Sequence, residues 1–119
     1  RMVFNVLAKN IDDHSKNFSF IMDKQGHWNL APAYDLVFSS DITAPNYVNV
    51  HSLSIGGKTK NITLADLATF AQKNDIKNYQ SAIKKVLSVV AKWKSYATNN
   101  NVPTEWIENI DTELKNMIL

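Results

Sequence analysis

Cysteine is absent from the 119 residues, which excludes a disulfide framework and any thiolate metal site. No apolar run approaches the ~20 residues that cross a bilayer, and no signal-peptide pattern opens the chain. Both absences favour a cytoplasmic protein with no membrane partner. Glycine occurs only three times, and the sequence has no G-x-G-x-x-G phosphate-binding pattern. The first residue is Arg1 instead of methionine, which indicates a fragment of a longer protein.

Net charge is also small. Thirteen basic and eleven acidic side chains give +2, too little to indicate a nucleic-acid-binding protein. The charge is uneven, because residues 58–95 carry eight basic and two acidic side chains, a net +6. Such a run is typical of a solvated face, with an anionic partner as the alternative. The 45% of hydrophobic residues suffices for one compact domain.

Helical periodicity dominates the chain. Apolar residues at spacings of three and four predict four helices, at residues 1–9, 64–73, 78–98 and from Pro103 onward. Thr63 and Asp66 form a predicted capping box before the second helix. The predicted buried face of the last helix comprises Trp106, Ile110, Leu114 and Met117. Trp28, Trp93 and Trp106 are expected to lie in the core or to be partly buried.

Strand signals are confined to short segments. Residues 18–22 and 27–30 flank a turn that ends at Gly26, which predicts a β-hairpin. A second short hairpin is expected from residues 53–55 and 58–62 around Gly56 and Gly57. Residues 36–50 lack periodicity and are expected to form an ordered loop. The predicted fold class is therefore α+β and mostly α, with one or two hairpins and at least three helices packed behind them.

The densest polar cluster of the sequence, residues 10–17, lies between the first helix and the first strand. Phosphoryl transfer requires a carboxylate that accepts the proton of the attacking hydroxyl, and oxygen ligands for Mg²⁺. In protein kinases these are the Asp and the Asn of a D-x-x-x-x-N loop. Asp12 and Asn17 have this spacing.

A third oxygen ligand is expected beyond the hairpin. If residue 22 pairs with residue 27, residue 18 lies opposite residue 31, so the chain returns to its starting point. Asp35 follows shortly after, and it would then face Asn17 at one end of the hairpin. Two hard oxygen donors suit Mg²⁺, which keeps its other positions for phosphate and water.

The joint pattern resembles a known family. The run Asn-x-Asp-Asp-His-x-Lys-Asn at 10–17, then Phe-Ser-Phe, then Trp-x-Leu-Ala-Pro-Ala-Tyr-Asp-Leu at 28–36, is similar to the signature of HipA-like serine/threonine kinases. These are the toxin components of bacterial toxin–antitoxin modules. The segment 53–58 and the capped helix after it also resemble the C-terminal region of that family. Residues 1–119 are thus expected to form a protein-kinase-like C-terminal lobe, with the catalytic elements in 1–36 and a helical bundle in 63–119.

The resemblance implies a role for each site residue. Asp12 would be the catalytic base, and Asn17 and Asp35 would ligate Mg²⁺. The residues expected to line the phosphates of ATP or the cation are His14, Ser15, Lys16, Asn17 and Tyr34. An ammonium such as that of Lys16 also offsets charge that accumulates on a transferring phosphate. The family further implies a protein substrate, in some members an aminoacyl-tRNA synthetase, and a DNA-binding antitoxin as partner, so that DNA contact would be indirect or weak.

Other interpretations compete with the kinase. The polar residues could serve turn chemistry alone. A zinc site is disfavoured because His14, His27 and His51 lack ligand spacing, and a Ser-His-Asp hydrolase because Asp13, His14 and Ser15 are adjacent. The chain contains no phosphate-covering loop and no strand lysine, so the N-terminal lobe is absent and this fragment alone is expected to be inactive. The alternative function is a non-catalytic helical module that docks an antitoxin or another protein.

Overall fold

The computed structural model describes residues 1–44 and 49–116. These residues form five α-helices, one two-stranded antiparallel sheet and a short 3₁₀ helix at Ser15–Asn17, which confirms an α+β fold that is mostly α. The helices and strands are α1 (Met2–Leu7), β1 (Phe20–Met22), β2 (Trp28–Leu30), α2 (Leu64–Lys73), α3 (Tyr79–Val90), α4 (Trp93–Asn99) and α5 (Thr104–Lys115). None of the described helices is long and apolar enough to cross a membrane.

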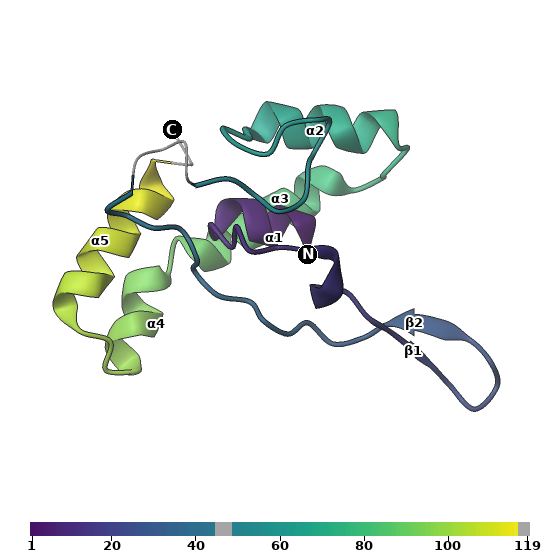
Figure 1. Ribbon diagram of the computed structural model, residues 1–119, viewed down its shortest axis with the longest axis horizontal. Coiled ribbons are helices and arrows are strands. Elements are labelled where there is room, and N and C mark those ends of the chain that lie inside the picture. Colours follow the sequence, from purple (N-terminus) through teal and green to yellow (C-terminus); the bar gives the residue numbers. More distant parts are fainter. Residues whose placement is uncertain (45–48, 117–119) are drawn as a thin grey trace.

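Helix α1 lies at the centre of the helical part (Figure 1). Its consecutive residues Val6 and Leu7 are each 1% exposed and point into different core clusters, because neighbours on a helix are about 100° apart. Val6 packs with three residues of the segment around α2, namely Ile55, Ile62 and Leu67. Leu7 packs with three residues of α3 and α5, namely Val90, Ile110 and Leu114. A helix this short is marginal on its own, so these contacts hold it in place.

Strands β1 and β2 form the first predicted hairpin, with a register one residue away from the prediction. Met22 pairs with Trp28 and Phe20 with Leu30, so residue 22 does not pair with residue 27. The carboxylate of Asp23 accepts hydrogen bonds from the backbone N–H groups of Gln25 and His27, which lengthens the turn by one residue. Gly26 has a φ of +88°, as the predicted turn requires.

The expectation that helices pack behind this hairpin is wrong. Figure 1 shows the hairpin extending away from the helices, and all six strand residues are exposed on both faces. Trp28 is 66% exposed, which contradicts its predicted burial. The radius of gyration is 15.6 Å, above the roughly 13.5 Å typical of a compact chain of this length.

The second predicted hairpin is reduced to a tight turn. Among the described residues, the only pairing there is an isolated bridge between Ile55 and Lys58. Gly56 and Gly57 have φ values of +59° and +85°, so the expected turn exists without strands. Ile55 instead turns into the core beside Val6. The predicted loop at 36–50 is irregular where it is described, and residues 45–48 lie outside the described residues.

Helix α2 has the predicted bounds and the predicted capping box. The Thr63 hydroxyl accepts from the Asp66 backbone N–H, and the Asp66 carboxylate accepts from the Thr63 N–H. The predicted long helix at 78–98 is instead broken at residues 91 and 92 into α3 and α4. Neither glycine nor proline causes the break. It leaves Trp93 at the start of α4, where the indole Nε1 donates to the Ile107 carbonyl of α5 at 3.2 Å.

Helix α5 begins one residue later than predicted, at Thr104, with Pro103 as its N-cap residue. Its buried face is formed by Ile107, Ile110, Asp111 and Leu114. Ile110 and Leu114 are buried as predicted, but Ile107 takes the place expected for Trp106, which is 57% exposed. Met117 lies outside the described residues.

Candidate functional site

The candidate site is built on the loop that leaves α1. Asn10 is 2% exposed, and its amide donates to the side chain of Asn5 at 3.1 Å and to the backbone carbonyl of Asp35 at 3.3 Å. The Ser39 hydroxyl accepts hydrogen bonds from the backbone N–H groups of Ile11 at 2.8 Å and Asp12 at 3.1 Å. It also donates to the Asn10 side chain at 3.4 Å. These bonds fix the loop backbone up to Asp12.

Asp12, Asn17 and Asp35 lie together at the base of the hairpin. The Asn17 amide donates to the backbone carbonyl of Asp12 at 3.2 Å and to Oδ2 of Asp35 at 2.8 Å. Asp35 has a φ of +52°, a left-handed conformation that Asp tolerates better than most residues. The Asp12 side chain is 63% exposed, so its carboxylate is open to an incoming group. One amide therefore links the two carboxylate-bearing segments.

The other predicted site residues surround this group. The 3₁₀ helix contains Ser15, Lys16 and Asn17, of which Ser15 and Lys16 are exposed. The Tyr34 hydroxyl donates to the Lys16 carbonyl at 2.7 Å, which ties the segment after β2 to this short helix. Nε2 of His14 lies 3.8 Å from Oδ1 of Asp12. Nδ1 of His14 is buried without a hydrogen-bond partner among the described residues.

Sequence reasoning missed two residues that hold this loop, Ser39 and His51. Nδ1 of His51 lies 3.0 Å from Oδ2 of Asp13, and both side chains are buried. No local motif marks either residue, because Ser39 lies in the irregular segment and His51 is 38 positions from Asp13. Only the arrangement of the chain in space identifies them.

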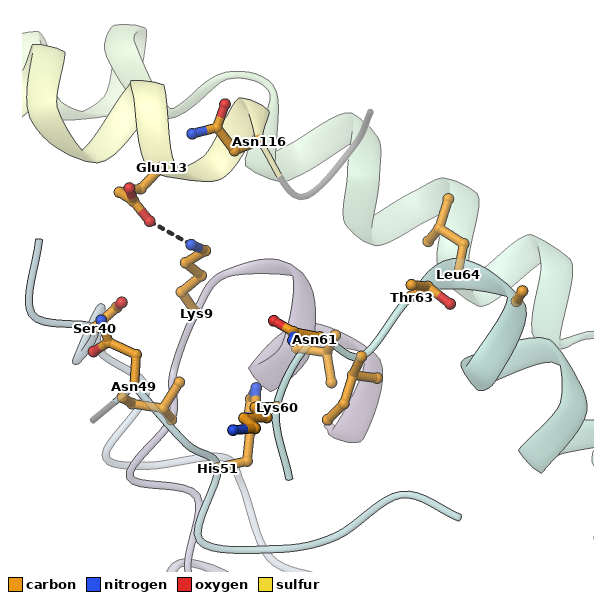
Figure 2. A pocket seen from close by; sticks show the side chains of 14 residues that line it. Lys9, Ser40, Asn49, His51, Lys60, Asn61, Thr63, Leu64, Glu113 and Asn116 are labelled. Atoms are coloured by element: carbon orange, nitrogen blue, oxygen red, sulfur yellow. Dashed lines mark hydrogen bonds and ion pairs between the residues drawn. The ribbon is translucent and has the colours of Figure 1, made fainter. Parts of the chain in front are cut away.

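A cavity of about 560 Å³ is lined in part by His51. Figure 2 shows Lys9, His51, Lys60 and Asn61 around it, with the ion pair between Lys9 and Glu113 at one end. Asp12, Asn17 and Asp35 are not among its lining residues. The cavity is thus separate from the candidate site and shares with it only the supporting residues Ile11 and His51.

The donor atoms at the candidate site fit magnesium better than zinc. Within the described ranges, no group of three or more His, Cys, Asp or Glu side chains is placed to hold a metal ion. His14, His27 and His51 each lie beside a different aspartate, Asp12, Asp23 and Asp13 respectively, and do not converge. Asn17 contacts Asp35 through its amide N–H group, so its Oδ1 atom and the carboxylate are the two hard oxygen donors of this group. Mg²⁺ commonly takes one or two such ligands, with phosphate and water as the others.

Comparison with known proteins identifies the family of the chain. The family model described as HipA-like C-terminal domain matches residues 1–94, which include all the candidate site residues. The chain is also 38% identical over 65 residues, 55% of its length, to a protein of Sinorhizobium fredii named "Putative kinase Y4mE". It spans only 14% of the length of that relative. By the match over most of its residues, the chain belongs to the HipA-like C-terminal domain family.

Proposed function

We propose that the chain is the C-terminal lobe of a serine/threonine protein kinase that transfers the γ-phosphate of ATP to a protein hydroxyl, as the toxin of a toxin–antitoxin module. The observation that carries the proposal is the Asn17 amide, which lies within 3.2 Å of the Asp12 carbonyl and 2.8 Å of the Asp35 carboxylate. Family membership and a relative named for a kinase support it. In this proposal residues 1–36 carry the catalytic elements and 63–119 the supporting helices.

The chemistry follows from what each side chain can do. The exposed Asp12 carboxylate accepts the hydroxyl proton while the hydroxyl oxygen forms its bond to the γ-phosphorus. The bond from that phosphorus to its bridging oxygen breaks, and ADP leaves with the electron pair. Asn17 and Asp35 would hold Mg²⁺, which when bound neutralises charge on the phosphates. The Lys16 ammonium, exposed beside them, offsets charge on the transferred group.

Tyr34 and His14 have supporting roles in this proposal. Tyr34 holds the 3₁₀ helix against the segment that carries Asp35, and His14 and Ser15 line the phosphates. The loop that covers the phosphates and the lysine that pairs with them are not recognisable in these 119 residues, so protein outside them must supply both. An antitoxin partner and a protein substrate remain part of the proposal on the family resemblance alone.

The test is phosphate transfer by the longest gene product that contains this sequence. Asp12→Ala and Asp35→Ala are each expected to lower transfer to a protein substrate by roughly 10²- to 10⁴-fold. Asp23→Ala, an aspartate at the tip of the hairpin, is the matched control and should change transfer less than about twofold. Equal transfer in wild type and Asp12→Ala would show that Asp12 is not the catalytic base. No transfer in the wild type, together with antitoxin binding, would favour the non-catalytic binding module.

A further inference from the structure

A buried pair of polar side chains, Asp13 and His51, adjoins the exposed Asp12 of the candidate site. Asp13 is 6% exposed and His51 is 9% exposed, and their side chains meet at 3.0 Å between Oδ2 and Nδ1. The second carboxylate oxygen of Asp13 accepts the backbone N–H of Leu53 at 3.1 Å. A carboxylate oxygen can accept a hydrogen bond and an imidazole Nδ1–H group can donate one, so this distance fits a hydrogen bond from His51 to Asp13. Both oxygens of Asp13 are thereby committed to the segment 51–53.

That segment is itself held firmly. The His51 N–H donates to the Thr59 carbonyl at 2.7 Å, and the Ser52 N–H donates to the Ile11 carbonyl at 3.0 Å. Two residues further on, Ile55 is 4% exposed in the core cluster that contains Val6. A continuous line of contacts therefore runs from the core through the segment 51–53 to Asp13, the neighbour of Asp12.

Asp12 lacks comparable support of its own carboxylate. Its side chain is mostly exposed, and the bonds that hold it run through its backbone N–H and carbonyl. Asp13 and His51 are too buried to touch a protein substrate or ATP. Their bonds instead decide where the backbone on the C-terminal side of Asp12 lies, and with it the direction of the Asp12 side chain.

We infer that Asp13 and His51 are positioning residues that aim Asp12 at the substrate hydroxyl, an inference that rests on the proposed function. A misplacement of about 1 Å in a catalytic group can lower the rate about 100-fold. Loss of the pair should therefore reduce kcat while binding of ATP, assigned to other residues, is retained.

A conservative substitution at position 51 can retain the hydrogen bond that the imidazole makes. An Asn side chain at position 51 can place its N–H group near the position of Nδ1, whereas Gln places it near Nε2. We expect His51→Leu and His51→Gln to lower kcat at least about 30-fold with the KM for ATP changed less than about twofold. His51→Asn should retain kcat within about fivefold. His27→Leu is the matched control, because His27 forms a similar pair with Asp23 at 3.1 Å but on the exposed hairpin.

A second set of measurements separates positioning from general damage. With the longest gene product that contains the sequence, His51→Leu should cause no further loss of residual transfer when Asp12 is already Ala, because the group being aimed is gone. An equal loss in both backgrounds would overturn the inference in favour of a purely structural role. Equal kcat in wild type and His51→Leu would overturn it as well.

Amide hydrogen exchange gives a readout that does not depend on activity. His51→Leu should accelerate exchange of the Leu53 and Asp12 amides at least about tenfold, and His51→Asn should not, with the melting temperature of the Asn variant near that of wild type. Absence of transfer by the wild type would count against the proposed function, and exchange alone would then decide whether the pair holds the loop. Unchanged exchange in His51→Leu would refute the inference.

Discussion

Asn10 is among the most deeply buried side chains of the molecule, although it carries a fully polar amide. Its partners belong to three parts of the chain: Asn5 on α1, Ser39 in the irregular segment and the backbone of Asp35. A buried polar group is tolerable only when it is hydrogen-bonded, so these partners make Asn10 specific to its position. The same bonds connect the start of the loop that carries Asp12 to Asp35, the residue proposed to hold Mg²⁺.

Replacement of Asn10 should lower the stability of the protein. Asn10→Ala leaves the Asn5 side chain and the Asp35 carbonyl without their donor, and we expect the free energy of unfolding to fall by about 1–3 kcal/mol. Urea denaturation of the purified protein measures this loss. Asn29→Ala, at an exposed position of β2, serves as control and should change stability by less than about 0.5 kcal/mol. Equal denaturation midpoints for both variants would contradict the assigned role of Asn10.

The sequence predicted the side chains of the candidate site, but it did not predict the residues that hold the loop in place. The spacing of Asp12 and Asn17, and the return of the chain through a hairpin to Asp35, predicted which side chains would meet, although the register was wrong by one residue. Their roles in catalysis stay predictions. Ser39 and His51 could not be found in this way, because their contacts join segments distant in sequence and no local propensity encodes such contacts.

At the scale of elements, features set by local sequence were predicted, whereas features set by tertiary contacts were not. Helix α2 was predicted to the residue because its capping box and its apolar stripe are local properties. The break between α3 and α4 was missed because the sequence there continues to favour a helix. The indole of Trp93 packs across to α5, and this contact between helices outweighs local propensity.

The capping box gives α2 a defined response to acid. The Lys58 ammonium, together with the Thr63 N–H and hydroxyl, lowers the pKa of Asp66 from 3.8 to about 2. A carboxylate whose pKa is lowered on folding stabilises the fold above the unfolded pKa and loses this effect as the pH falls through the folded pKa. The stability difference between wild type and Asp66→Asn should therefore shrink as the pH falls from about 4 to about 2.

Urea denaturation at a series of pH values measures this difference. Lys58→Met removes the largest cause of the lowered pKa, so it should move the acid-sensitive range toward higher pH. A difference between wild type and Asp66→Asn that is independent of pH would show that the carboxylate does not titrate in this range.

At the scale of the whole molecule, the hairpin is the part least covered by the rest of the chain. Large apolar side chains on both of its faces are exposed, namely Phe20, Ile21, Met22, Trp28 and Leu30. A strand pair normally gains stability by burying one face, and here neither face is buried by the described residues. The hairpin is held at its base, where Ser19 and Ala31 are hydrogen-bonded and Arg1 donates to the Ala31 carbonyl.

Tryptophan fluorescence can test this exposure in the 119-residue chain. Trp28 and Trp106 are more than half exposed, whereas Trp93 is partly buried against α5. We expect acrylamide to quench most of the emission, and Trp28→Phe and Trp106→Phe each to remove part of the quenchable fraction. Trp93→Phe should remove the protected fraction instead. A quenchable fraction unaltered by Trp28→Phe would mean that the hairpin is covered, for example by a second copy of the chain.

The packing of α1 has a consequence for folding during synthesis. Leu7 rests on Ile110 and Leu114, and Lys9 pairs with Glu113, so the helix that precedes the candidate loop is completed by the last described helix. A ribosome synthesises the candidate loop early and helix α5 about a hundred residues later. Lys9 and Glu113, for example, are 104 positions apart in the sequence. Contacts so distant in sequence form late. A nascent chain that stops before α5 therefore carries the full motif but not the fold that orients it.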